Sequence, residues 1–152
     1  MFDVLVFMFE NYFANHAMPN NEVMEQELSA AGFEQNDILG AFDWFQEMKS
    51  RLHRADAFYS HQYSGHRVFT ETECKKINTE SLGFVIFLQQ AGVINDMERD
   101  LIIDRAMALK QQEIKVEEMR WVTMIALWNE GREKDYLFVE DALFNPRGLT
   151  IH

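Results

Sequence analysis

Apolar residues return every three or four positions along most of the chain, which is the spacing of amphipathic helices. In residues 2–16 the positions Phe2, Leu5, Phe9 and Tyr12 follow this spacing, and Pro19 ends the pattern. The signal for extended chain is confined to a very short segment near 67–69. The pattern predicts an all-α fold, a compact bundle of about seven helices, with the later helical windows at 21–31, 34–52, 70–77, 79–91, 95–109, 116–129 and 135–144.

Residues that cap helices mark several of these boundaries. Asn21 and Thr79 stand where a side-chain oxygen can accept a hydrogen bond from the first free amides of a helix. Gly92 and Gly131 follow the last apolar positions of two windows, and glycine readily adopts the left-handed conformation that closes a helix. Two pairs have the spacing of a capping box: Thr70 with Glu73, and Asn95 with Glu98.

We interpret the whole of residues 1–152 as one domain with three regions. Residues 1–52 contain acidic helices, two of which are joined by a short turn at Gly32 into a helix–turn–helix-like unit. Residues 53–69 mix aromatic and polar side chains with neither helical nor strand periodicity, which predicts a connector loop. Residues 70–152 form a helical core. Its most apolar window, at 79–91, is expected to lie at the centre.

The size and composition are those of a cytoplasmic globular protein. A chain of 152 residues and 17.9 kDa buries enough surface to fold without a disulfide or a structural metal. The single cysteine, Cys74, fits a reducing compartment. The apolar run at 4–9 lacks the cationic segment of a secretory signal. No stretch approaches the roughly 20 apolar residues of a membrane span, so we expect no membrane association.

The distribution of charge is the most informative feature of the sequence. The net charge is −11, and residues 1–48 contain nine acidic side chains but no lysine or arginine. Residues 49–67 carry a net charge of +3 and the remainder −5. Two interpretations remain open: a solvated face that keeps an aromatic-rich protein in solution, or an electrostatic docking surface for a basic partner.

The acidic region argues against binding of duplex DNA. Proteins that read a duplex approach its phosphates with lysine, arginine or helix N-termini, whereas the helix at 34–52 carries four carboxylates. Trp44 is expected at the border of the apolar stripe and half exposed, and exposed tryptophan often anchors interfaces. A protein partner of unknown identity is therefore predicted, with four contact residues: Asp37, Asp43, Trp44 and Glu47.

No combination of residues predicts catalysis, a cofactor or a metal site. The glycine-rich phosphate-binding motifs and the nucleophile elbow do not occur in the sequence. His53, His61 and His66 with Cys74 are zinc-ligand types, but their spacing matches no compact ligand knuckle. Cys74 lies beside two lysines, yet no base is clearly positioned to activate it as a nucleophile. We predict a protein that is not an enzyme.

Segments along nearly the whole chain carry a further signal. They are residues 1–5, Ala31-Gly32-Phe33, 37–38, 41–44, 67–70, Glu73-Cys74, Gly83-Phe84, 87–88, and 115–129 around Arg120-Trp121-Val122. In these segments the chain resembles the bacterial Smg family. The resemblance implies a small cytoplasmic protein of unestablished function, often encoded near DNA-processing and topoisomerase-related proteins. The family defines no catalytic or binding residues, so none is carried over.

Two functions from different classes follow from these patterns. The first is a non-enzymatic interaction or regulatory protein that presents residues 1–48 to a basic protein. The alternative is a module for single-stranded nucleic acid that uses the basic connector 49–67, where Phe58, Tyr59 and Tyr63 could stack on bases.

Overall fold

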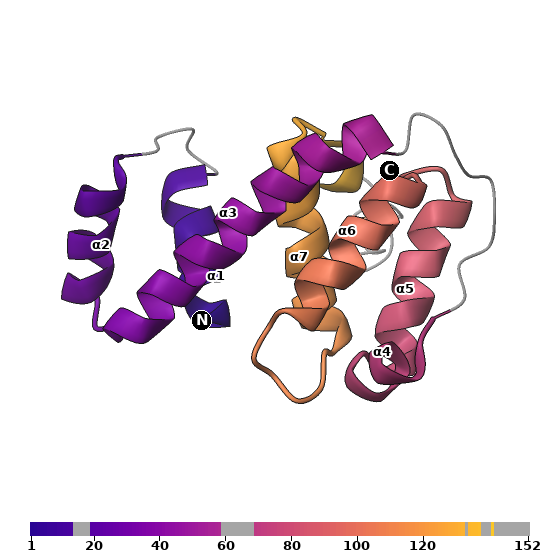
Figure 1. Cartoon of the computed structure of the whole chain (residues 1–152), viewed down its shortest axis with the longest axis horizontal. Helices are drawn as coiled ribbons and strands as arrows, with labels where there is room; N and C mark the ends of the chain where they lie inside the picture. The colour runs from indigo at the N-terminus through magenta and orange to yellow at the C-terminus, as the bar shows by residue number, and fades with distance from the viewer. Residues whose placement is uncertain (14–18, 59–68, 133, 138–140, 142–152) are drawn as a thin grey trace, which may run out of the picture.

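The computed structural model describes residues 1–13, 19–58, 69–132, 134–137 and 141; for Phe13 and residues 53–58 it describes the backbone. The regular elements of this part of the chain are all helices, which confirms the predicted all-α fold (Figure 1). Its only non-helical pairing is one parallel bridge between Ile77 and Ile114. The elements are α1 (Phe2–Met8), the π-helix η1 (Phe9–Phe13), α2 (Asn21–Ala30), α3 (Gln35–Phe58), α4 (Glu71–Lys76), α5 (Thr79–Gln90), α6 (Asp96–Met107) and α7 (Val116–Asn129).

The capping residues are close to those predicted. Both capping boxes form, at the starts of α4 and α6, and Gly32, Gly92 and Gly131 all have positive φ. Two caps were predicted one residue too late: Asn20 caps α2 and Asn78 caps α5. In each case the asparagine oxygen accepts from the amide three residues on. For α5 the preceding asparagine is a stronger cap than Thr79.

Helix α3 is longer than the sequence predicts. It continues through Phe58, so the prediction that the connector loop begins at His53 is wrong for the backbone of residues 53–58. Helix propensity depends on the residues present and not only on an apolar period, and this stretch contains neither glycine nor proline. The rest of the connector, at 59–68, lies outside the described residues, and so does most of the window 135–144.

The N-terminal helices form one end of the molecule. Helix α2 packs on α3 after the turn at Gly32 and makes the predicted helix–turn–helix-like unit (Figure 1). The ring of Phe7 in α1 meets Phe33 edge-on, with ring centres 5.4 Å apart. From η1, the hydroxyl of Tyr12 donates a hydrogen bond to Glu27 of α2. Burial, together with the hydrogen bond to Glu27 and the charge of Glu27, raises the pKa of Tyr12 to about 12.

The centre of the molecule is α6 and not α5. Helix α6 packs against α3, α5 and α7, whereas α5 lies with α4 at the end opposite α2 (Figure 1). Seven of the 12 residues of α6 are buried, against four of the 12 in α5. The prediction that the most apolar helix is central is therefore wrong. Apolar composition alone does not fix the position of a helix, because charged side chains can be buried when they are paired.

Candidate functional site

The nine carboxylates of residues 1–48 all lie in the described part of the chain, and none of them is buried. Eight of them lie on α1, η1, α2, the α2–α3 turn and the first half of α3, which pack together at one end of the molecule, and Glu47 lies near the middle of α3 (Figure 1). We call this set the acidic surface: Asp3, Glu10, Glu22, Glu25, Glu27, Glu34, Asp37, Asp43 and Glu47. The folded chain thus keeps at one end most of the charge that the sequence concentrates in its first third.

Some of these carboxylates make contacts within the chain. Glu27 accepts from Tyr12, and Glu25 accepts from the side-chain amide of Gln35. These two bonds connect α2 to its neighbours. Close to them, an open groove at the α2–α3 turn is lined by Glu22, Glu25, Gln26, Ser29, Ala30 and Gln35.

The three predicted acidic contact residues do not share one face of α3. Asp43 and Glu47 are four positions apart and lie on the same side of the helix, with Asp43 exposed and Glu47 half buried. Asp37 faces α1, where one carboxylate oxygen lies 3.3 Å from the N-terminal ammonium of Met1. The structure therefore brings Asp43 and Glu47 together and holds Asp37 apart from them.

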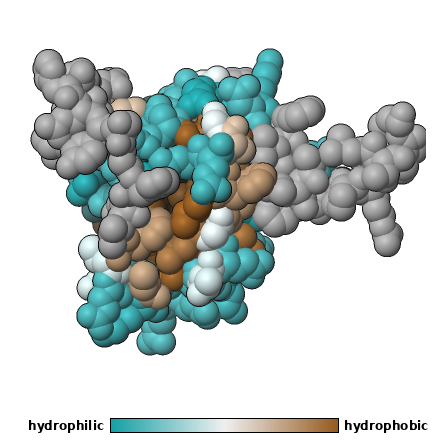
Figure 2. Space-filling model, turned by 90° about the vertical axis from the view of Figure 1, so that its right-hand side faces the viewer, coloured by the Kyte–Doolittle hydropathy of each residue, from teal (hydrophilic) through white to brown (hydrophobic). Residues whose placement is uncertain are grey.

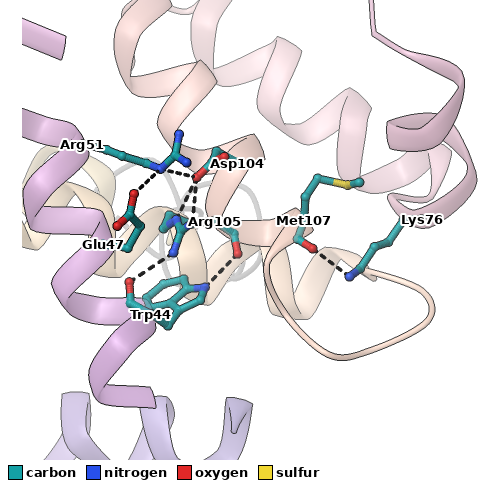
Figure 3. Close-up of polar contacts among 7 residues, drawn as sticks. All are labelled: Trp44, Glu47, Arg51, Lys76, Asp104, Arg105 and Met107. Atoms are coloured by element: carbon teal, nitrogen blue, oxygen red, sulfur yellow. Dashed lines mark hydrogen bonds and ion pairs between the residues drawn. The ribbon is translucent and has the colours of Figure 1, made fainter. Parts of the chain in front are cut away.

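Trp44 is buried and not half exposed as predicted. Only 3% of it is accessible. Its Nε1 donates to the main-chain carbonyl of Arg105 at 2.8 Å, and Nη1 of Arg105 donates to the carbonyl of Trp44 at 3.2 Å (Figure 3). The guanidinium carbon also lies 5.8 Å from the indole centre. The sequence missed this position because helix α6, which covers Trp44, lies 61 residues further along the chain.

Arg105 and Trp44 belong to a chain of polar contacts that joins α3 to α6. Asp104 accepts from Nε of Arg105 at 2.9 Å and also lies 3.1 Å from Nε of Arg51 (Figure 3). Arg51 in turn donates to Glu47 at 3.0 Å. One acid of the acidic surface is therefore connected through two arginines to the centre of the molecule.

The last turn of α6 is completed by side chains from two other helices. The final four carbonyls of a helix have no partner within it. Trp44 of α3 satisfies the carbonyl of Arg105, and Nζ of Lys76 in α4 donates to the carbonyls of Met107, at 2.8 Å, and Leu109 (Figure 3). The positive charge of Lys76 also suits the negative end of the helix dipole. No sequence pattern pairs Lys76 with a helix that ends 31 residues later.

Two other buried charged side chains of α6, Glu98 and Arg99, also have polar partners. The carboxylate of Glu98, a residue that is 1% exposed, accepts hydrogen bonds from the main-chain amide of Asn95 and from the guanidinium of Arg132. Burial alone would lower the pKa of Arg132, but the bond and charge of Glu98, with the charges of Glu130 and Asp135, raise it. Arg99 donates to Asp100 at 3.0 Å and to the side chain of Gln89, in α5, at 3.1 Å.

The described residues contain no group of three or more His, Cys, Asp or Glu side chains placed to hold a metal ion. Cys74 is exposed. The side chains of His53, His61 and His66, which the zinc hypothesis also needs, lie outside the described residues. No helix in the described ranges is both long and apolar enough to cross a bilayer.

The basic connector is described only at its start. Nζ of Lys49 lies 4.9 Å from the centre of the Phe45 ring, and Arg51 is shared by Glu47 and Asp104. Both cations thus have partners within the chain. The side chains of Phe58, Tyr59 and Tyr63, on which stacking of bases would depend, lie outside the described residues.

The fold and its charged surface define a class of small, acidic, all-helical proteins. A family model described as a protein of unknown function (DUF494) matches residues 1–152. A curated protein named Protein Smg homolog from Methylobacillus flagellatus is 49% identical over the full length of both chains. The proteins of the same name from Bordetella petrii and Nitrosococcus oceani are 34% and 36% identical, over 100% of both chains and over 99% of this chain and 96% of the relative.

The chain therefore belongs to this family, whose curated members carry the name Protein Smg homolog, as the resemblance predicted. No solved structure matches the chain. The family description assigns no activity, so any function has to be argued from the residues of the site.

Proposed function

We propose that this protein is a non-enzymatic interaction protein that docks a basic region of another protein on its acidic surface. The observation that carries the proposal is that nine carboxylates occur in residues 1–48 without one lysine or arginine, and that none of the nine is buried. The like charges of this surface repel one another, although the N-terminal ammonium lies beside Asp37 and Arg51 beside Glu47. A basic partner relieves that repulsion while it is steered toward the surface.

The contact set differs from the one that the sequence suggested. Asp43, Glu47 and Asp37 remain in it, because all three are at least partly accessible. Trp44 leaves the set as a direct contact, since α6 covers it, and instead fixes the position of α3. Glu22 and Glu25 join it, because they line the groove beside the α2–α3 turn.

The chemistry of the surface restricts the class of partner. An acidic surface selects regions rich in lysine and arginine. Regions of that kind are how proteins neutralise nucleic-acid phosphates. We therefore propose that the partner is a protein that itself handles DNA. The acidic protein does not contact the duplex with this surface, because carboxylates repel phosphates.

Charge reversal combined with affinity capture tests the proposal. The variant Glu22→Lys/Glu34→Lys/Asp43→Lys changes three exposed carboxylates of the acidic surface. We expect recovery of the partner from the native cell to fall at least about tenfold, and that of the wild type to fall steeply with added salt. A second variant, Asp37→Asn/Glu47→Gln, weakens the surface with smaller side-chain changes.

The matched control is Glu71→Lys/Glu113→Lys/Glu117→Lys, which makes the same change in net charge at three exposed positions outside the acidic surface. The control is expected to retain the partner. Equal losses in the two triple variants, or salt-insensitive recovery of the same partner, would contradict the proposal. Circular dichroism of each variant confirms that the helices remain folded.

A further inference from the structure

An exposed leucine lies beside the groove at the α2–α3 turn. Leu39 of α3 is 45% exposed. It follows Gln35, which lines the groove, by one helical turn, so the two side chains lie on the same side of α3. Asp43, which is also exposed, follows Leu39 by another turn. This side of α3 therefore presents one large apolar side chain between a polar and an acidic one.

The other wall of the groove is a polar side of α2. Its lining residues Glu22, Gln26 and Ser29 recur every three or four positions, so they form one ridge along the helix. At the rise of an α-helix this ridge is about 10 Å long, or two turns. The side-chain amide of Gln35 donates to Glu25, a bond that connects the two walls. The groove thus has helical side-chain spacing on the α2 wall and a leucine beside the α3 wall.

The charges of the two helices select a basic occupant for the groove. Helix α2 contains three glutamates and no lysine or arginine. The first basic residue of α3 is Lys49, more than two turns beyond Leu39. Complementary charge steers a basic segment to such walls and disfavours an acidic one. Leu39 adds a requirement that charge alone does not make, because an apolar side chain of the occupant has to cover it.

From the groove, its charge and the exposed leucine, we propose that the partner's basic region is an amphipathic helix that lies between α2 and α3. Its basic side chains face Glu22 and Glu25, and one apolar side chain covers Leu39. A helix fits this groove because it presents side chains at the same spacing as the ridge of α2. This inference rests on the proposed function and adds the form of the partner's docking segment.

Two synthetic peptides of identical composition separate the form of the partner from its charge. Both contain lysine, leucine and alanine over about four helical turns. In the first peptide the leucines recur every three or four positions and form one apolar stripe, and in the second they are spread around the helix. Isothermal titration calorimetry of the full chain at low salt measures the two affinities. We expect the first peptide to bind at least about tenfold more tightly than the second.

The variant Leu39→Ser locates the apolar contact. It should weaken binding of the first peptide at least about fivefold and leave binding of the second unchanged. The matched control is Ile86→Ser, since Ile86 is also an exposed apolar residue, at 37%, but lies on α5. Figure 2 looks at the end of the molecule that carries α5, where apolar atoms gather in a strip between hydrophilic areas. Binding that depends on Ile86 and not on Leu39 would overturn the proposal.

The variant Glu22→Gln/Glu25→Gln removes the charges of the groove and should weaken binding of both peptides. Equal affinities for the two peptides, both lost in the variant Glu22→Lys/Glu34→Lys/Asp43→Lys, would overturn the helix in the groove and leave the proposed function in place. A protein that binds neither peptide would overturn both proposals. Circular dichroism should also show that the first peptide gains helix when it binds.

Discussion

Helices α5 and α6 are both 12 residues long, and their positions are the reverse of what their compositions suggest. Helix α5 has one charged residue and yet lies at an end of the molecule with an apolar face exposed. Helix α6 has six charged residues and yet is the more deeply buried of the two, with Glu98, Arg99 and Arg105 among its buried side chains. Hydropathy summed along a helix therefore gives the wrong order for this pair.

The difference shows what allows charge to be buried. Each buried charge of α6 has a partner: Glu98 has Arg132, Arg99 has Asp100, and Arg105 has Asp104. Burying a charge is costly unless it is paired and hydrogen-bonded. An apolar face carries no such requirement, and its exposure is unfavourable in proportion to its area.

The largest expected effect separates the two sides of α5. Phe84 is 7% exposed and meets the ring of Tyr136, with ring centres 6.4 Å apart, whereas Phe87 is 43% exposed. We expect Phe84→Ala to lower the free energy of unfolding by about 3–4 kcal/mol, because it leaves a cavity in the core. Phe87→Ala should lower it by less than about 1 kcal/mol, because the side chain is already partly exposed. Urea denaturation at low protein concentration measures both, and equal losses would contradict the orientation of α5.

The next effect concerns the paired charges of α6. Glu98→Ala removes the capping bond to Asn95 and leaves Arg132 without its buried partner. We expect a loss of about 2–3 kcal/mol in the free energy of unfolding, reduced from the value for a fully buried pair because Arg132 is partly exposed. Glu113→Ala, at an exposed position, is the control and should cost less than about 0.5 kcal/mol. If the two variants are equally stable, the pairing does not explain the burial of α6.

The smallest effect distinguishes two adjacent lysines of α4. Lys76→Met removes the donor to the carbonyls at the end of α6, and we expect it to cost about 1–2 kcal/mol. Lys75→Met breaks only an exposed pair with Glu71 four residues earlier, worth less than about 0.5 kcal/mol. Thermal unfolding of the two variants side by side gives the difference. If Lys75→Met lowered the stability more than Lys76→Met, the role of Lys76 as the donor at the end of α6 would be contradicted.

The sequence predicted part of the candidate site for a simple physical reason. Carboxylates are rarely buried without partners, so nine of them in 48 residues had to lie at least partly on the surface. The prediction failed for Trp44. The apolar stripe along α3 shows which side of the helix faces the core, but it does not show how far around the helix a neighbouring helix covers the residues beside that stripe. Asp37 shows the same limit, since its partner is the chain's own N-terminus.

The sequence by itself determined the helices, their main caps and glycine stops, the concentration of negative charge, and the family. These features depend on residues close together in the chain, where spacing and backbone preference act directly. Only the tertiary structure decided that α6 is central, that Trp44 and Lys76 complete its last turn, and that α5 keeps an exposed face. Each of these depends on which helices meet across 30 to 60 residues of intervening chain, and periodicity within a single helix carries no information about its neighbours.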